Sequence, residues 1–147
     1  MATSSNAEIR ARRGEILAQM FLGELGAVTL QEPVKSLDFL GIFPGRSGGQ
    51  VVMAVEVKTR DTEIGDTFPV SDSMRRVAEA SNVPLLLMVI DVRRNTFRFG
   101  WLDEFVRASP RTSARLPLLK QSQLPAEIQR RLPNAEVSTT STSLVIP

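Results

Sequence analysis

Residues 83–90 form an unbroken apolar run, and this run constrains the fold of the chain more than any other feature. Its length is that of a β-strand, and it has no polar position that could face water. Such a run is typical of a central strand that is buried on both faces of a sheet. The run therefore predicts a sheet with other elements packed against both of its sides.

Other patterns surround this strand with further elements. They predict helices at 7–26, 70–82, 102–108 and 124–132, and strands at 27–30, 37–43, 51–58 and 96–101. Residues 44–49 are rich in Gly and Pro and separate two of these strands, which predicts an antiparallel hairpin. The order of elements predicts an α/β fold with a mixed central β-sheet flanked by helices.

The helix predicted at 7–26 carries apolar residues around most of its circumference. Five of them share one face: Ile9, Ile16, Leu17, Met20 and Phe21. Smaller or equally apolar residues cover much of the remaining surface. We therefore expect this helix to be packed between other elements rather than to lie on the surface.

The 147 residues include no cysteine, no histidine and no tyrosine. These absences exclude disulfides, thiolate or imidazole metal ligands, Ser-His-Asp triads and tyrosyl nucleophiles. An enzyme made from this chain would use Asp, Glu, Lys, Arg, Ser or Thr, and such donors favour Mg²⁺ or Mn²⁺. The sequence has neither an apolar run of the ~20 residues that span a bilayer nor the apolar stretch of a secretory signal. We expect a cytoplasmic protein that does not enter membranes.

Charge is unevenly distributed along the chain. Residues 1–91 hold 9 basic and 12 acidic side chains, a net charge of −3, whereas residues 92–147 hold 9 basic and 4 acidic ones, a net charge of +5. The basic part could bind phosphate beside a more acidic metal site, or its arginines could simply be solvated. Both interpretations stay open at this point.

The predicted hairpin holds the residues with the most chemical information. Asp38 precedes its turn, and Glu56 and Lys58 follow it. Glu56 and Lys58 are two apart on a strand, so they share a face, with Val55 and Val57 on the other. A metal ion and a phosphate group would account for two charges in an otherwise apolar strand. The alternatives are an ion pair on an exposed edge strand for Glu56 and Lys58, and a turn cap for Asp38.

The hairpin residues bear a resemblance to a known family. Asp38 followed by Val55-Glu56-Val57-Lys58-Thr59-Arg60 resembles the PD-(D/E)XK nuclease superfamily. The segment Gly14-Glu15-Ile16-Leu17-Ala18, with Leu22 and Gly26, is similar to the opening helix of small endonuclease-like proteins in that superfamily. The resemblance covers residues 7–105, and Leu37 replaces the proline that gives the superfamily its name.

This resemblance implies a restriction-endonuclease-like core in residues 1–110, followed by a C-terminal extension at 111–147 with a short helix and a Ser/Thr-rich tail. It also implies a metal-dependent endonuclease that hydrolyses phosphodiester bonds in DNA. Asp38, Glu56 and Glu15 would bind Mg²⁺ or Mn²⁺. Lys58 would position or deprotonate the attacking water and steady the charge of the phosphate. Glu24 competes with Glu15 as the carboxylate from the first helix.

DNA is the partner that the resemblance implies, and such cores also act as homodimers or inside larger defence or repair proteins. The alternative function is a catalytically silent module that keeps the fold and binds nucleic acid or a partner protein. A phosphatase or nucleotide hydrolase has less support, because the turn at 45–49 lacks the lysine and the context of a phosphate-binding loop.

Several other residues are interpreted as structural. We expect Asp91 to be a turn residue and Trp101, with Phe97 and Phe99, to belong to the core rather than to a base-stacking surface. The paired arginines at 75–76, 93–94 and 130–131 are expected to be solvated in most cases, with one pair in contact with phosphate.

Overall fold

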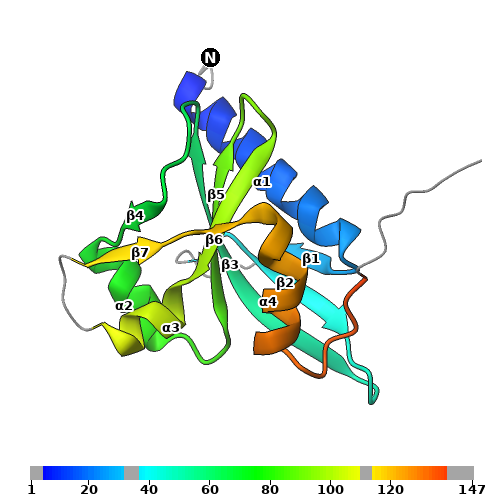
Figure 1. Cartoon of the computed structure of the whole chain (residues 1–147). Coiled ribbons are helices and arrows are strands. Elements are labelled where there is room, and N and C mark those ends of the chain that lie inside the picture. Colours follow the sequence, from blue (N-terminus) through cyan, green and yellow to red (C-terminus); the bar gives the residue numbers. More distant parts are fainter. Residues whose placement is uncertain (1–4, 32–36, 110–113, 139–147) are drawn as a thin grey trace, which may run out of the picture.

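The computed structural model describes residues 5–31, 37–109 and 114–138. Within them the helices are α1 (Asn6–Glu24), α2 (Asp72–Ala80), α3 (Leu102–Ala108), the 3₁₀ turn η1 (Gln121–Gln123) and α4 (Leu124–Arg131). The strands are β1 (Val28–Gln31), β2 (Phe39–Pro44), β3 (Gln50–Arg60), β4 (Thr67–Pro69), β5 (Leu85–Asp91), β6 (Thr96–Trp101), β7 (Arg115–Pro117) and β8 (Leu119–Lys120). Figure 1 shows the helices on both sides of a central sheet.

The central sheet has six strands in the order β1-β2-β3-β5-β6-β8. Strands β3 and β5 are parallel, and every other neighbouring pair is antiparallel. This arrangement confirms the predicted α/β class with a mixed central sheet and the predicted hairpin, which is the pair β2 and β3. A separate small sheet is formed by β4 and β7.

Strand β5 is the centre of the structure, as the apolar run predicted. All of its residues are buried, because core layers cover both of its faces. Leu86, Met88 and Ile90 pack in the layer beneath α1 and α4. Leu85, Leu87 and Val89 pack in the opposite layer, beneath α2 and α3. The alternation of a strand therefore divides this run between two hydrophobic cores.

Helix α1 differs from the prediction that it would be packed between other elements. Ile9, Ile16 and Met20 are 56%, 50% and 56% exposed, so one apolar face of this helix points away from the protein. The buried residues of α1 are Gly14, Ala18 and Leu22, which lie four apart on a single stripe. The expectation was wrong because α1 meets the sheet along one stripe, and Ile9, Ile16 and Met20 lie on another face that no element in the described residues covers. No helix in the described parts of the chain is both long and apolar enough to cross a membrane.

Gly14 allows α1 to approach β3 closely. A Cβ atom at position 14 would overlap Cγ2 of Thr59, which lies on β3. Glycine has no Cβ, so the helix backbone can lie directly against this side chain. Glu15 follows Gly14 in the helix, so this contact holds Glu15 near the part of β3 that carries Thr59.

The segment predicted as a C-terminal extension contributes to the same sheet and core. Strand β8 pairs with β6, and β7 pairs with β4. Leu124, Ile128 and Leu132 pack with α1 in one hydrophobic layer, and the short helix predicted at 124–132 is α4. Most of the predicted Ser/Thr-rich tail, from residue 139 onward, lies outside the described residues.

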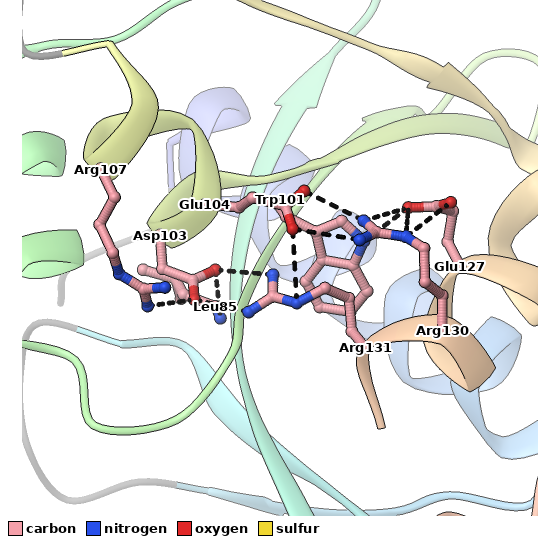
Figure 2. A network of polar contacts seen from close by, with 8 residues as sticks. All are labelled: Leu85, Trp101, Asp103, Glu104, Arg107, Glu127, Arg130 and Arg131. Carbon is pink, nitrogen blue, oxygen red and sulfur yellow. Dashed lines mark hydrogen bonds and ion pairs between the residues drawn. The ribbon is translucent and has the colours of Figure 1, made fainter. Parts of the chain in front are cut away.

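A buried carboxylate joins α3 and α4 to the start of β5. The side chain of Asp103 is fully buried and lies 2.8 Å from both Arg107 and Arg131 (Figure 2). It also accepts the backbone N–H of Leu85 at 3.0 Å. Burial acts to raise the pKa of Asp103, but the hydrogen bonds from Arg131 and Leu85 outweigh it and hold the pKa below its usual range.

Candidate functional site

The candidate site lies just before the first residue of β2, where β3 extends beyond its pairing with β2. The register of these two strands begins at Phe39 and Val55, and the N–H of Asp38 still donates to the carbonyl of Val55 at 3.2 Å. Beyond this point, β3 remains paired with β5 as far as Arg60. The segment from Glu56 to Arg60 is therefore paired with β5 on one side. On its other side lies Asp38, which precedes the first residue of β2.

Asp38 lies directly before Phe39, the residue at which the pairing of β2 with β3 begins. Its Oδ2 accepts the backbone N–H of Val57 at 2.6 Å, so a carboxylate takes the place that a strand carbonyl would hold. In the described residues no second protein donor reaches this carboxylate. Asp38 is thus held in one orientation by β3 while it retains acceptor capacity for another ligand.

Glu56 and Lys58 share a face of β3, as their spacing predicted. Lys58 Nζ lies 3.2 Å from Glu56 Oε2, and the two side chains are 35% and 17% exposed. Val55 and Val57 point to the opposite face and belong to the core beneath α1. The pair is an ion pair on a part of β3 that is paired with β5 alone among the described residues, because β2 pairs with β3 only as far as Val55. This position fits the alternative interpretation, an ion pair on an edge strand, as well as it fits a cation site.

The electrostatics of Glu56 are unfavourable to its charged form. Burial and the charge of Asp38 raise the pKa of Glu56, and the charge of Glu15 adds to this effect. The charge of Lys58 and its hydrogen bond act in the opposite direction without cancelling the shift. Among the described residues, Glu56 is therefore an acid that the fold holds beside two other carboxylates, Asp38 and Glu15, and the lysine Lys58.

Glu15 is the carboxylate from α1 that belongs to this group. Burial and the charge of Asp38 raise the pKa of Glu15, while Arg12 acts to lower it. Glu24, its competitor, is exposed at the last residue of α1 and contributes to neither shift. The close contact of Gly14 with Thr59 explains the difference, because it holds this end of α1 against β3.

The three carboxylates influence one another's charge without forming a shell of three ligands. Among the described residues, no group of three or more Asp or Glu side chains is arranged to hold a metal ion. Mg²⁺ does not require such a group, since it commonly keeps several waters and binds one or two carboxylates together with phosphate oxygens. Asp38 and Glu56 offer the hard oxygen donors that Mg²⁺ and Mn²⁺ prefer.

Arg60 adds a second cation to the row that Glu56 and Lys58 begin. It lies two residues beyond Lys58 on the same face of β3, and its guanidinium stacks 5.0 Å from the ring centroid of Phe68. A planar cation on an aromatic ring can still present its N–H groups to a phosphate. The sequence signal for Arg60 is its spacing of two residues from Lys58, which places it in this row of the strand.

Three of the six paired arginines form ion pairs within the protein. Arg94 forms an ion pair with Asp91. Figure 2 shows Arg131 at Asp103 and Arg130 between Glu104 and Glu127. These ion pairs leave the basic C-terminal part with less charge for phosphate than its composition suggests.

The residues interpreted as structural are confirmed in those roles. Asp91 accepts the backbone N–H groups of Arg93 and Arg94 and caps the turn. Trp101, Phe97 and Phe99 are buried in the core. The indole N–H of Trp101 donates to Glu127 at 3.1 Å, so this ring has a partner at its polar end.

The chain matches no family model, and comparison with curated proteins gives no match either. The relation to the PD-(D/E)XK nucleases therefore remains a prediction from the resemblance of a few motifs.

Proposed function

We propose that this chain is a metal-dependent endonuclease that hydrolyses phosphodiester bonds in DNA. One observation carries the proposal: Val57 N–H holds the carboxylate of Asp38 at 2.6 Å, next to a Glu56 whose pKa is raised by burial and by the charge of that carboxylate. Placing two partly buried acids side by side is unfavourable without a cation. Sites with shifted pKa values of this kind are frequent at functional centres.

The order of elements supports a restriction-endonuclease-like core. A helix with Gly14 and Glu15 precedes the strand after Asp38, and a hairpin leads from it to the strand with Glu56 and Lys58. This is the order of motifs that the resemblance implied. The buried parallel strand β5 then supports β3 along the whole segment that carries the charged residues.

The side chains have distinct roles in this proposal. Bound Mg²⁺ or Mn²⁺ would neutralise charge on the phosphate and make an attached water more acidic. Asp38 and Glu56 would hold the ion, and Glu15 would join them directly or through water. Lys58 would donate to a phosphate oxygen or orient the attacking water, since its ammonium already lies at the carboxylate of Glu56. No histidine is needed for these roles.

A catalytically silent module that binds nucleic acid or a partner protein is the second candidate. It is favoured by the absence, in the described residues, of three acidic side chains arranged around one point. The ion pair of Glu56 with Lys58 would then serve only to stabilise β3.

Cleavage of mixed linear, circular and single-stranded DNA in Mg²⁺, Mn²⁺ or EDTA tests this function. The protein, its Lys58→Ala variant and a Lys120→Ala control would be compared, because Lys120 is an exposed lysine on β8. We expect metal-dependent cleavage by the protein and the control, and none by Lys58→Ala. Salt-sensitive DNA binding without cleavage in all three would favour the silent module, and cleavage by all three would indicate another site or a contaminant.

A further inference from the structure

A pocket of about 290 Å³ opens beside the ion pair of Glu56 and Lys58. Both charged residues lie at its lining, and the rest is formed by α2 and by the first residues of β5 and α3. The proposed chemistry at Asp38, Glu56 and Lys58 makes no use of this space. Because Lys58 lines the pocket and is also the residue proposed to contact a phosphate, the pocket adjoins the proposed phosphate position.

The lining of the pocket is apolar below and polar at its rim. Leu85 and Leu102 are 0% and 1% exposed and lie deepest in the protein, and Met74 is nearly as buried. Val77 is half-buried and Ser73 is exposed, so both lie nearer to the rim. A ligand that entered here would leave its charged part at Lys58 and bury an uncharged part against leucine, valine and methionine.

The size and lining limit what this uncharged part can be. The volume is close to the lower end of small-ligand pockets, which are ~300 Å³ and larger, so a base pair or a stretch of duplex is too large. A single planar ring system that is attached to a phosphate has the required combination of an apolar face and a charged end. Enzymes that bind an unstacked nucleobase hold it between apolar side chains in a pocket of this kind.

We propose that this pocket holds the nucleobase next to the scissile phosphate, so that the site acts on nucleotides whose base is unpaired. The inference rests on the phosphodiesterase function proposed above. Opening a base pair costs a few kcal/mol, so single strands, bubbles and ends would be better substrates than continuous duplex.

The same lining predicts weak discrimination among bases. Among the described residues that line the pocket, Ser73 is the only one with an uncharged polar side chain, and its hydroxyl lies 3.1 Å from the hydroxyl of Ser71. Base identity is read by several directed hydrogen bonds, whereas stacking and apolar contact accept every base. Met74 adds an adaptable side chain to the wall.

The test compares three labelled DNA substrates in Mg²⁺ or Mn²⁺: a duplex, the same duplex with an unpaired bubble, and that bubble with one abasic nucleotide at the cleaved position. We expect the bubble to be cleaved about tenfold faster than either of the others. Val77→Phe, which fills the pocket, should abolish this preference. Val137→Phe adds the same bulk to the opposite core layer and should retain it.

A binding measurement separates this inference from the proposed function. The unfolding temperature of the protein would be followed with deoxynucleoside 5′-monophosphates and with deoxyribose 5-phosphate, which lacks a base. Stabilisation by the nucleotides alone supports the pocket, whether or not DNA is cleaved. Equal effects of both compounds, or equal cleavage of the abasic and intact bubbles, would overturn the pocket assignment. If the pocket assignment failed in this way but Lys58→Ala still abolished cleavage, the proposed nuclease function would be retained and only the nucleobase pocket would be rejected.

Discussion

Asp38 and Val57 are joined by a hydrogen bond of 2.6 Å between a carboxylate oxygen and a backbone N–H, at the point where β2 stops pairing with β3. Burial raises the pKa of both Glu15 and Glu56, and the charge of the same carboxylate raises both further. Asp38 thus has a structural role at the end of a strand and an electrostatic role in the candidate site. The two roles can be separated by substitution.

Asp38→Asn and Asp38→Ala should differ in stability but not in activity. The asparagine keeps an oxygen acceptor for Val57, whereas alanine leaves this N–H unpaired at a cost of ~1–3 kcal/mol in the free energy of unfolding. Both variants lose the carboxylate, so we expect DNA cleavage to fall about 100-fold or more in each. Urea unfolding and cleavage rates check this pair. Full activity in a folded Asp38→Asn variant would remove Asp38 from the proposed chemistry.

Glu56→Gln should stabilise the protein at neutral pH when no divalent cation is present. The pKa of Glu56 is raised above 4.5 in the folded state. Its contribution to stability is therefore fully present below pH 4.5 and is lost as the pH rises through the folded pKa. Glutamine does not titrate, so the variant should match the protein in acid and exceed it at pH 7. Unfolding in EDTA at several pH values measures this difference, and a variant that is less stable at pH 7 contradicts the account.

Gly14→Ala should weaken the packing of α1 on β3. The new Cβ would overlap Cγ2 of Thr59, and such overpacking costs about 1–3 kcal/mol in a well-packed core. Thr59→Ser removes the overlapping methyl group and should restore most of the loss in the double variant. Gly23→Ala is a control in the same helix, because nothing lies within 4 Å of a Cβ there. A double-mutant cycle with no coupling between positions 14 and 59 would contradict this description of the contact.

Asp103→Ala should be strongly destabilising, although within the described residues Asp103 has no hydrogen bond or ion pair with Asp38, Glu56 or Lys58. It leaves Arg131, whose side chain is 13% exposed, without its buried partner, and such changes cost ~3–5 kcal/mol. Arg107→Ala removes the other, 67% exposed partner and should cost at most about 1 kcal/mol. Chemical unfolding distinguishes the two. Similar small losses in both variants would show that Asp103 does not hold α3 and α4 together as described.

Much of the fold could be predicted from patterns that depend on local sequence. The apolar run of β5, the turn between β2 and β3, and the helices α2, α3 and α4 were predicted within a few residues, because each has a clear periodicity or turn composition. Strands β4, β7 and β8 were not predicted. They have only two or three residues, so alternation cannot be detected, and their pairing depends on contacts between distant segments.

The candidate site could be predicted only in part. Spacing alone placed Glu56 and Lys58 on one face of a strand. It could not distinguish Glu15 from Glu24, since that choice depends on the close approach of Gly14 to Thr59. The pocket beneath α2 also depends on tertiary packing, because Met74, Leu85 and Leu102 come from three different elements.

Binding of Mn²⁺, followed by the loss of the free-ion signal in electron paramagnetic resonance, is the most direct test of the central claim that Asp38 and Glu56 form a cation site. We predict binding by the protein, at least tenfold weaker binding by Asp38→Asn and Glu56→Gln, and unchanged binding by a Glu24→Gln control. The stability of the protein should then rise by ~2.7 kcal/mol when free Mn²⁺ is 100 times its Kd. Absence of Mn²⁺ binding, or binding that both substitutions leave unchanged, would contradict the account.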